Sequence, residues 1–149
     1  MSIDLETEIP ELISEHDAIG RQLGQLRRVS SADVADIAAI TAFRWRLAQA
    51  MAAHHAKAMP VIRCLLEHGD APAVRSVRGF LDGHVGVQEY NQAFFASWPL
   101  DRLRADWSAF RLEAEIFVTQ VERVMREEEQ AVYDHAVRLS CLRRGRSAA

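Results

Sequence analysis

The sequence is poor in the residues that break helices and cross-link chains. Its 149 residues include only seven glycines, four prolines and two cysteines. Cys64 and Cys141 form neither a disulfide framework nor a CxxC pair, which favours a cytoplasmic protein with reduced thiols. The sequence also lacks a glycine-rich phosphate-binding loop and the G-x-S-x-G turn of a serine hydrolase. No motif therefore supports nucleotide binding or serine-hydrolase chemistry.

Long apolar runs and a strong net charge are also absent. The apolar runs are far shorter than the roughly 20 residues of a membrane-spanning helix, and the acidic N-terminal segment lacks the apolar core of a targeting signal. The formal net charge of −3 gives no reason to expect binding to nucleic acid or to a membrane. Because 49% of the residues are hydrophobic, the chain has enough apolar side chains for one soluble, well-packed domain.

Apolar residues recur at helical spacing along nearly the whole chain, without the two-residue alternation of a half-buried strand. The pattern predicts four helices, at residues 8–28, 32–67, 73–97 and 101–142. Short connections join them, so the predicted fold is all-α, an up-down-up-down antiparallel four-helix bundle over residues 1–142. Residues 143–149 are interpreted as a basic C-terminal tail.

One proline lies where a helix resists it. Pro60 falls deep in the second predicted helix, where it removes the hydrogen bond to the Ala56 carbonyl and crowds the preceding turn. The cost is about 3 kcal/mol. We therefore expect a kink or a bulge near Pro60.

Each predicted helix carries one polar residue on its otherwise apolar, inward stripe. These residues are His16, His54, His84 and Glu128. An unpaired buried polar group costs roughly 1–3 kcal/mol, so one such residue per helix indicates that the four meet at a shared site. Counted from the helix ends nearest the 69–72 turn, their levels differ by roughly 9 Å, which side chains and tilt largely absorb. Three imidazoles and a carboxylate suit iron, zinc or manganese.

Each candidate also has a purely structural interpretation. A buried histidine often hydrogen-bonds to a backbone carbonyl or a carboxylate, and His84 stands near two glycines that permit close helix contact. His54 competes with His55, and one of the two is expected on the surface. In the acidic run 127–129, helical phase turns only Glu128 inward.

Short motifs surround the candidate residues in a definite order. The first is EHDAI at 15–19, and the second is HHAK at 54–57 with a turn that ends at Asp70. His84 follows, and then the acidic run REEE at 126–129. These segments resemble the EHxxI, H-x-x-x-E, third-helix histidine and acidic fourth-helix motifs of the hemerythrin-like, or HHE cation-binding, family. The resemblance covers most of the chain and depends on the order and spacing of its motifs.

Members of that family hold two irons, joined by carboxylates, inside a four-helix bundle, and they bind or sense oxygen, nitric oxide or iron. The resemblance implies such a centre here, but Ala58 stands where a bridging glutamate is expected and Val124 where a histidine is expected. We therefore expect at most one tightly bound metal, iron by resemblance, instead of a complete di-iron site. A vestigial site is equally consistent with these losses. The predicted metal ligands are His16, His54, His84 and Glu128.

Three functions are compatible with these features. The first is a metal-binding module that senses or buffers oxygen, nitric oxide or iron itself. The second is a metal-dependent oxidase or peroxide-consuming enzyme, which the missing carboxylate bridge disfavours. The third is a metal-free protein that kept the fold and acts on a regulatory protein partner. We favour the first function, a binding protein over an enzyme. The sequence leaves open whether the chain is a monomer or a homodimer.

Overall fold

The computed structural model describes the backbone of residues 3–147 and the side chains of residues 3–142. Every regular element in that part of the chain is helical, which confirms the predicted all-α class. None of those helices is long and apolar enough to cross a bilayer. Of the expected tail at 143–149, residues 143–147 continue the last helix, and residues 148–149 lie outside the described part.

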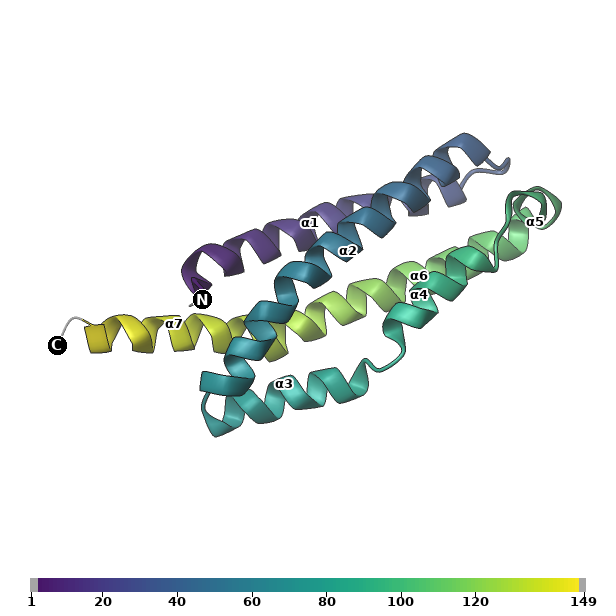
Figure 1. The fold of residues 1–149 in the computed structure, drawn as a ribbon. Helices are drawn as coiled ribbons and strands as arrows, with labels where there is room; N and C mark the ends of the chain where they lie inside the picture. Colours follow the sequence, from purple (N-terminus) through teal and green to yellow (C-terminus); the bar gives the residue numbers. More distant parts are fainter. Residues whose placement is uncertain (1–2, 148–149) are drawn as a thin grey trace.

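The first two helices are close to their predicted positions. Helix α1 spans Leu5–Ser30 and helix α2 spans Ile37–His68. Asp4 and Asp36 begin them, each accepting a hydrogen bond from a backbone N–H of the first turn, as a good N-cap residue does. The two helices pack side by side over most of their length (Figure 1).

The third predicted helix, 73–97, is two helices. Helix α3 spans Ala71–Gly83 and helix α4 spans Val87–Ala96. Between them Gly86 has a φ of 86°, a left-handed conformation that glycine adopts without steric cost. The helical pattern of apolar residues continues across this break, so periodicity alone predicted one helix where the backbone makes two (Figure 1).

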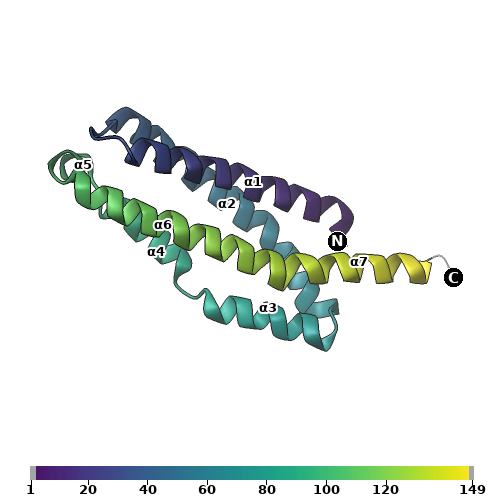
Figure 2. The ribbon, with the colours of Figure 1, turned by 180° about the vertical axis from the view of Figure 1, so that it is seen from behind.

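The fourth predicted helix, 101–142, is also divided. A short helix α5 (Leu100–Ala105) precedes α6 (Trp107–Glu128), and a π-helical turn, η1 (Glu129–Tyr133), joins α6 to α7 (Asp134–Ser147). Figure 2 shows α6 and α7 following one another almost in line. Helix α2 is α-helical throughout, so of the two outcomes expected at Pro60 the bulge is not found. Figure 1 shows α2 curving toward α3 in its C-terminal half. The π-helical turn lies at η1 instead.

The apolar core consists of two clusters that follow one another along the helices. In the first cluster, the C-terminal half of α1 packs on three elements: the N-terminal half of α2, helix α4 and helix α6. It includes Phe94 stacked on Phe117, with ring centroids 4.3 Å apart. In the second cluster, the N-terminal turns of α1 pack on the C-terminal half of α2, on α3 and on α7. Leu12 and Leu65 are fully buried in this cluster. Helices α1 and α2 therefore contribute to both clusters.

A layer of buried polar side chains separates the two clusters. On α1, His16 lies between Leu12 of the second cluster and Ile19 of the first. His54 on α2 and Glu128 at the end of α6 belong to the same layer. Because water is excluded on both sides, these groups must satisfy one another or bind a ligand.

We expect Trp98→Ala to lower the free energy of unfolding by about 3–5 kcal/mol, because Trp98 is 1% exposed and its removal leaves a cavity in the first cluster. Trp45→Ala is the matched control, since Trp45 is 67% exposed, and it should change stability by no more than about 0.5 kcal/mol. Urea denaturation measures both values. An equal loss for the two variants would contradict this description of the core.

Candidate metal centre

Three of the four predicted residues meet in the polar layer. His16 comes from α1, His54 from α2 and Glu128 from the last turn of α6, and all three are buried. The Nε2 atoms of the two histidines are 3.3 Å apart. Glu128 Oε2 lies 3.3 Å from His54 Nε2 and 3.8 Å from His16 Nε2. One donor atom of each residue therefore faces a common point.

The spacing of these atoms fits a single metal ion. Three points separated by 3.3, 3.3 and 3.8 Å lie on a circle whose radius is roughly 2 Å. Histidine nitrogen and carboxylate oxygen bind zinc at about 2.0–2.2 Å. The three residues could therefore hold a metal ion. Because two nitrogens and one oxygen also suit iron and manganese, the donor set does not identify the metal.

Further carboxylates face the outer nitrogens of both imidazoles. His16 Nδ1 lies 2.8 Å from Glu129 Oε1, within hydrogen-bonding distance. His54 Nδ1 lies 3.4 Å from Glu15 Oε2, close enough for electrostatic attraction but without hydrogen-bond geometry. Histidines that bind metals commonly donate their second N–H to a carboxylate in this way, which keeps the proton off the nitrogen that faces the metal.

Lys57 completes this outer arrangement at the surface. Its Nζ lies 2.9 Å from Glu15 Oε1 and 2.9 Å from Glu11 Oε2. The ammonium group stands one turn after His54 on α2, so it holds the Glu15 carboxylate over the outer edge of the His54 ring. Because Lys57 and Glu11 are exposed at their tips, this pair contributes more to position than to stability.

Tyr133 is a fourth polar group at the centre. Its hydroxyl donates to Glu128 Oε1 at 3.2 Å and lies 3.1 Å from His16 Nε2. In an α-helix, residues five apart point about 140° away from each other. The π turn between Glu128 and Tyr133 is wider, so both side chains reach the same side of the chain. Burial, aided by the Glu128 charge, raises the pKa of Tyr133 and keeps the phenol a neutral donor.

The charges of the centre stabilise one another. Burial raises the pKa of Glu128, but hydrogen bonds with His16 and His54 outweigh that effect and lower the pKa to about 2. Burial also lowers the pKa of His16, but Glu128 and Glu129 more than offset it, so the pKa of His16 is raised. The carboxylate therefore stays ionised at neutral pH, and the imidazole beside it attracts a cation or a proton.

The predicted fourth ligand, His84, is not part of this group, which corrects the ligand set expected from the sequence. His84 follows the last residue of α3 and has a non-helical φ of −115°. Its Nδ1 hydrogen-bonds to the Phe80 carbonyl, and its Nε2 lies 2.7 Å from Glu127 Oε2. The break before α4 thus turns the ring toward its own helix and the edge of α6.

Sequence reasoning missed three members of the centre. Glu129 was placed on the solvent face by α-helical phase, and the π turn brings it to His16 instead. Tyr133, five residues after Glu128, would point away from it in a regular α-helix, and the π turn brings the two together. Glu15 adjoins His16 in sequence, but its carboxylate faces His54 Nδ1 across the interface between α1 and α2. No pattern within one helix reveals such a contact.

The two positions where the resemblance expects ligands, Ala58 and Val124, contribute no donor atom. Ala58 is buried in the second apolar cluster, so the position faces inward, as predicted, and carries only a methyl group. Val124 lies on α6 one turn before Glu128 and is half-buried. Among the described residues, the group formed by His16, His54 and Glu128 is the only one with metal-ligand spacing.

Comparisons with protein families, with characterised proteins and with solved structures find no match to this chain. The assignment of the centre consequently depends on its own geometry: donor spacing, burial and the outer carboxylates. Those three features are independent of one another, and all of them concern the same three side chains.

We expect the metal-free protein to show a pH-dependent stability that originates at His16 and Glu128. Because the folded state raises the pKa of His16, its contribution is fully present below its ordinary value of 6.5 and is lost as pH rises through the folded value. The contribution of Glu128 is present above 4.5 and is lost as pH falls toward 2. The stability difference between wild type and His16→Gln should therefore be largest between pH 4.5 and 6.5.

Chemical denaturation at a series of pH values, with a chelator present, measures this difference. His68→Gln is the matched control, because His68 is exposed at the end of α2 and should leave the wild-type pH dependence unchanged. A stability difference for His16→Gln that does not vary with pH would contradict the description of the centre.

Proposed function

We propose that this chain is a metal-binding module that holds one divalent transition-metal ion through His16, His54 and Glu128. The observation that carries the proposal is that both histidines turn Nε2 toward Glu128 while each Nδ1 faces another carboxylate. With the protons on Nδ1, two Nε2 lone pairs face each other at 3.3 Å. In that tautomer the two lone pairs repel each other, and either a cation between them or a proton on one Nε2 removes the repulsion.

We propose iron as the resident metal. Two imidazoles and one carboxylate form the ligand set of non-haem iron(II) sites that leave coordination positions open, although zinc and manganese accept the same donors. Three protein ligands leave room for water or for a small molecule such as oxygen or nitric oxide. The proposed role is accordingly to sense or buffer such a ligand, or iron itself.

We also propose that the module is hemerythrin-like and that its helices form an up-down-up-down four-helix bundle. Its four legs are α1, α2, the α3–α4 pair and the series from α5 to α7. Short connections at 31–36, 69–70 and 97–99 support this topology, as does the order of the motifs around His16, His54 and Glu128. The loss of family ligands at Ala58 and Val124 supports a site for one metal instead of two.

We expect the purified protein to bind one metal ion per chain and His54→Ala to weaken that binding by more than about 100-fold, because a direct ligand is lost. His55→Ala is the matched control, since His55 is the exposed neighbour of His54 on the same helix. Elemental analysis gives the stoichiometry, and titration with Fe(II) under anaerobic conditions or with Zn(II) gives the affinity. Thermal melts should show that chelator lowers the wild-type midpoint and leaves that of His54→Ala nearly unchanged.

Two results would overturn this assignment. Two irons per chain with the absorption band of an oxo bridge would show that the ligand set is larger than His16, His54 and Glu128. Equal wild-type midpoints with and without chelator, after metal removal has been verified, would show that no metal contributes to the fold.

We expect the outer carboxylates to tune affinity without acting as ligands. Glu129→Gln should weaken metal binding by about 10–100-fold at unchanged stoichiometry, because the His16 imidazole loses the partner that orients it. Glu127→Gln is the matched control, since Glu127 belongs to the same acidic run but pairs with His84 and Arg123. A loss of stoichiometric binding in Glu129→Gln would instead make Glu129 a direct ligand.

A metal-free regulatory protein is the second candidate, and one observation favours it. Tyr133 donates to Glu128, and a proton on His16 pairs with the same carboxylate, so the centre also has a way to satisfy its charges without an ion. The chelator melts above separate this candidate from the first. Optical spectra of the iron-loaded protein with nitric oxide or peroxide separate a sensor, which forms a stable adduct, from an enzyme, which consumes peroxide.

A further inference from the structure

Both oxygens of the Glu128 carboxylate face the proposed metal position. Oε1 lies 3.2 Å from His54 Nε2, and Oε2 lies 3.3 Å from the same atom. A carboxylate placed in this way is able to bind an ion through one oxygen or through both. The number of coordination positions left for a further ligand depends on which of the two modes Glu128 adopts.

Tyr133 distinguishes the two oxygens of this carboxylate. Its hydroxyl donates to Oε1 at 3.2 Å, whereas Oε2 is the oxygen nearer to His16 Nε2, at 3.8 Å. The hydroxyl itself lies 3.1 Å from His16 Nε2, so it approaches Oε1 from the side of the centre. It therefore competes for the lone pair of Oε1 that a chelating carboxylate would give to the ion.

The Tyr133 side chain is held firmly in this position. It is 3% exposed, it belongs to the second apolar cluster, and its ring centroid lies 5.3 Å from that of His16. The structure gives its hydroxyl two acceptors, His16 Nε2 and Glu128 Oε1. An ion bound to His16 would take the Nε2 lone pair and leave Oε1 as the acceptor. A buried hydroxyl does not readily give up its last partner.

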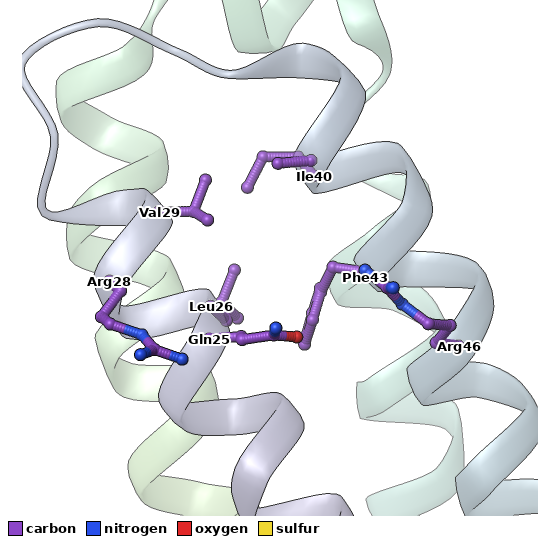
Figure 3. Close-up of a pocket in the computed structure, with 8 residues that line it drawn as sticks. Gln25, Leu26, Arg28, Val29, Ile40, Phe43 and Arg46 are labelled. Atoms are coloured by element: carbon purple, nitrogen blue, oxygen red, sulfur yellow. The ribbon is translucent and has the colours of Figure 1, made fainter.

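The centre has room for a small ligand only. His16 is 4% and Glu128 is 7% exposed, and apolar clusters lie on both sides of them. The hollow between the end of α1 and the beginning of α2, which Figure 3 shows at Leu26 and Phe43, is lined by no residue of the centre. A ligand at the proposed metal is accordingly one that binds through a single atom, such as nitric oxide or azide.

We propose that Tyr133 keeps a coordination position open for such a ligand by holding Glu128 Oε1 away from the metal. The carboxylate then binds the ion through Oε2 alone. Without the hydroxyl, both oxygens bind and the second one closes the open position. Tyr133 is thus a positioning residue that acts through Glu128. Because it needs an ion held by His16, His54 and Glu128, this role rests on the proposed function.

Tyr133→Phe removes the hydroxyl and keeps the ring in the second cluster. We expect it to bind iron at wild-type stoichiometry and with equal or higher affinity, because a second carboxylate oxygen joins the ion. We expect its Fe(II) form to bind nitric oxide at least about tenfold more weakly than wild type. Anaerobic titration of the full chain, followed by optical absorption, measures both affinities. Tyr90→Phe is the matched control, since Tyr90 is the other tyrosine and is 40% exposed.

Cobalt(II) in place of iron reports the coordination number directly. Its visible absorption weakens as the number of ligands rises, so Tyr133→Phe should give weaker bands than wild type or Tyr90→Phe. Azide should change the cobalt spectrum of wild type and leave that of Tyr133→Phe nearly unchanged. Tyr133→Leu, which also lacks the hydroxyl, replaces Tyr133→Phe if circular dichroism shows that the latter does not fold.

Three results would overturn the role of Tyr133. The first is a parallel loss of metal and nitric oxide binding in Tyr133→Phe, which a purely structural role would produce. The second is nitric oxide binding as tight as in wild type. The third is weaker nitric oxide binding with unchanged cobalt bands, which would make the bound ligand, and not Glu128, the partner of the hydroxyl.

Metal content is measured on the same samples. Wild type that binds no metal overturns the proposed function and the role of Tyr133 with it. Metal bound at equal stoichiometry in wild type and Tyr133→Phe, with equal nitric oxide binding, overturns only the role of Tyr133.

Discussion

The contact between His16, His54 and Glu128 is the constraint on which the middle of this protein depends. An ionised carboxylate and two imidazoles lie between two apolar clusters, where an unsatisfied charge costs several kcal/mol. Each surrounding feature lowers that cost: Glu129 and Glu15 face the outer nitrogens, and the Tyr133 hydroxyl donates to the carboxylate. The π turn at Glu129–Tyr133 is the part of the chain that brings Glu129 and the Tyr133 hydroxyl to the centre.

The same contact explains how the centre could hold a cation. Three donor atoms spaced 3.3–3.8 Å apart surround a point at metal-bond distance from each, and the hydrogen bond between His16 Nδ1 and Glu129 favours the matching tautomer of His16. A proton on His16 Nε2 also pairs with the Glu128 carboxylate, but it joins only His16 and Glu128. The Nε2 lone pair of His54 is then left without a partner. A metal ion bound there would compete with that proton, so binding, folding and pH would be linked at one position.

The sequence by itself determined the all-α class and the inward positions of His16, His54 and Glu128, because apolar side chains at helical spacing define one buried face within each helix. It also showed that Ala58, where the hemerythrin resemblance expects a bridging glutamate, carries no donor atom. Only the tertiary structure decided that His84 turns away, since the backbone leaves the helix at His84 and Gly86 while the helical spacing of the apolar residues continues across both. Only the tertiary structure brought in Glu15, Glu129 and Tyr133, because contacts across α1 and α2 and the width of one π turn are not encoded in the phase of a regular helix.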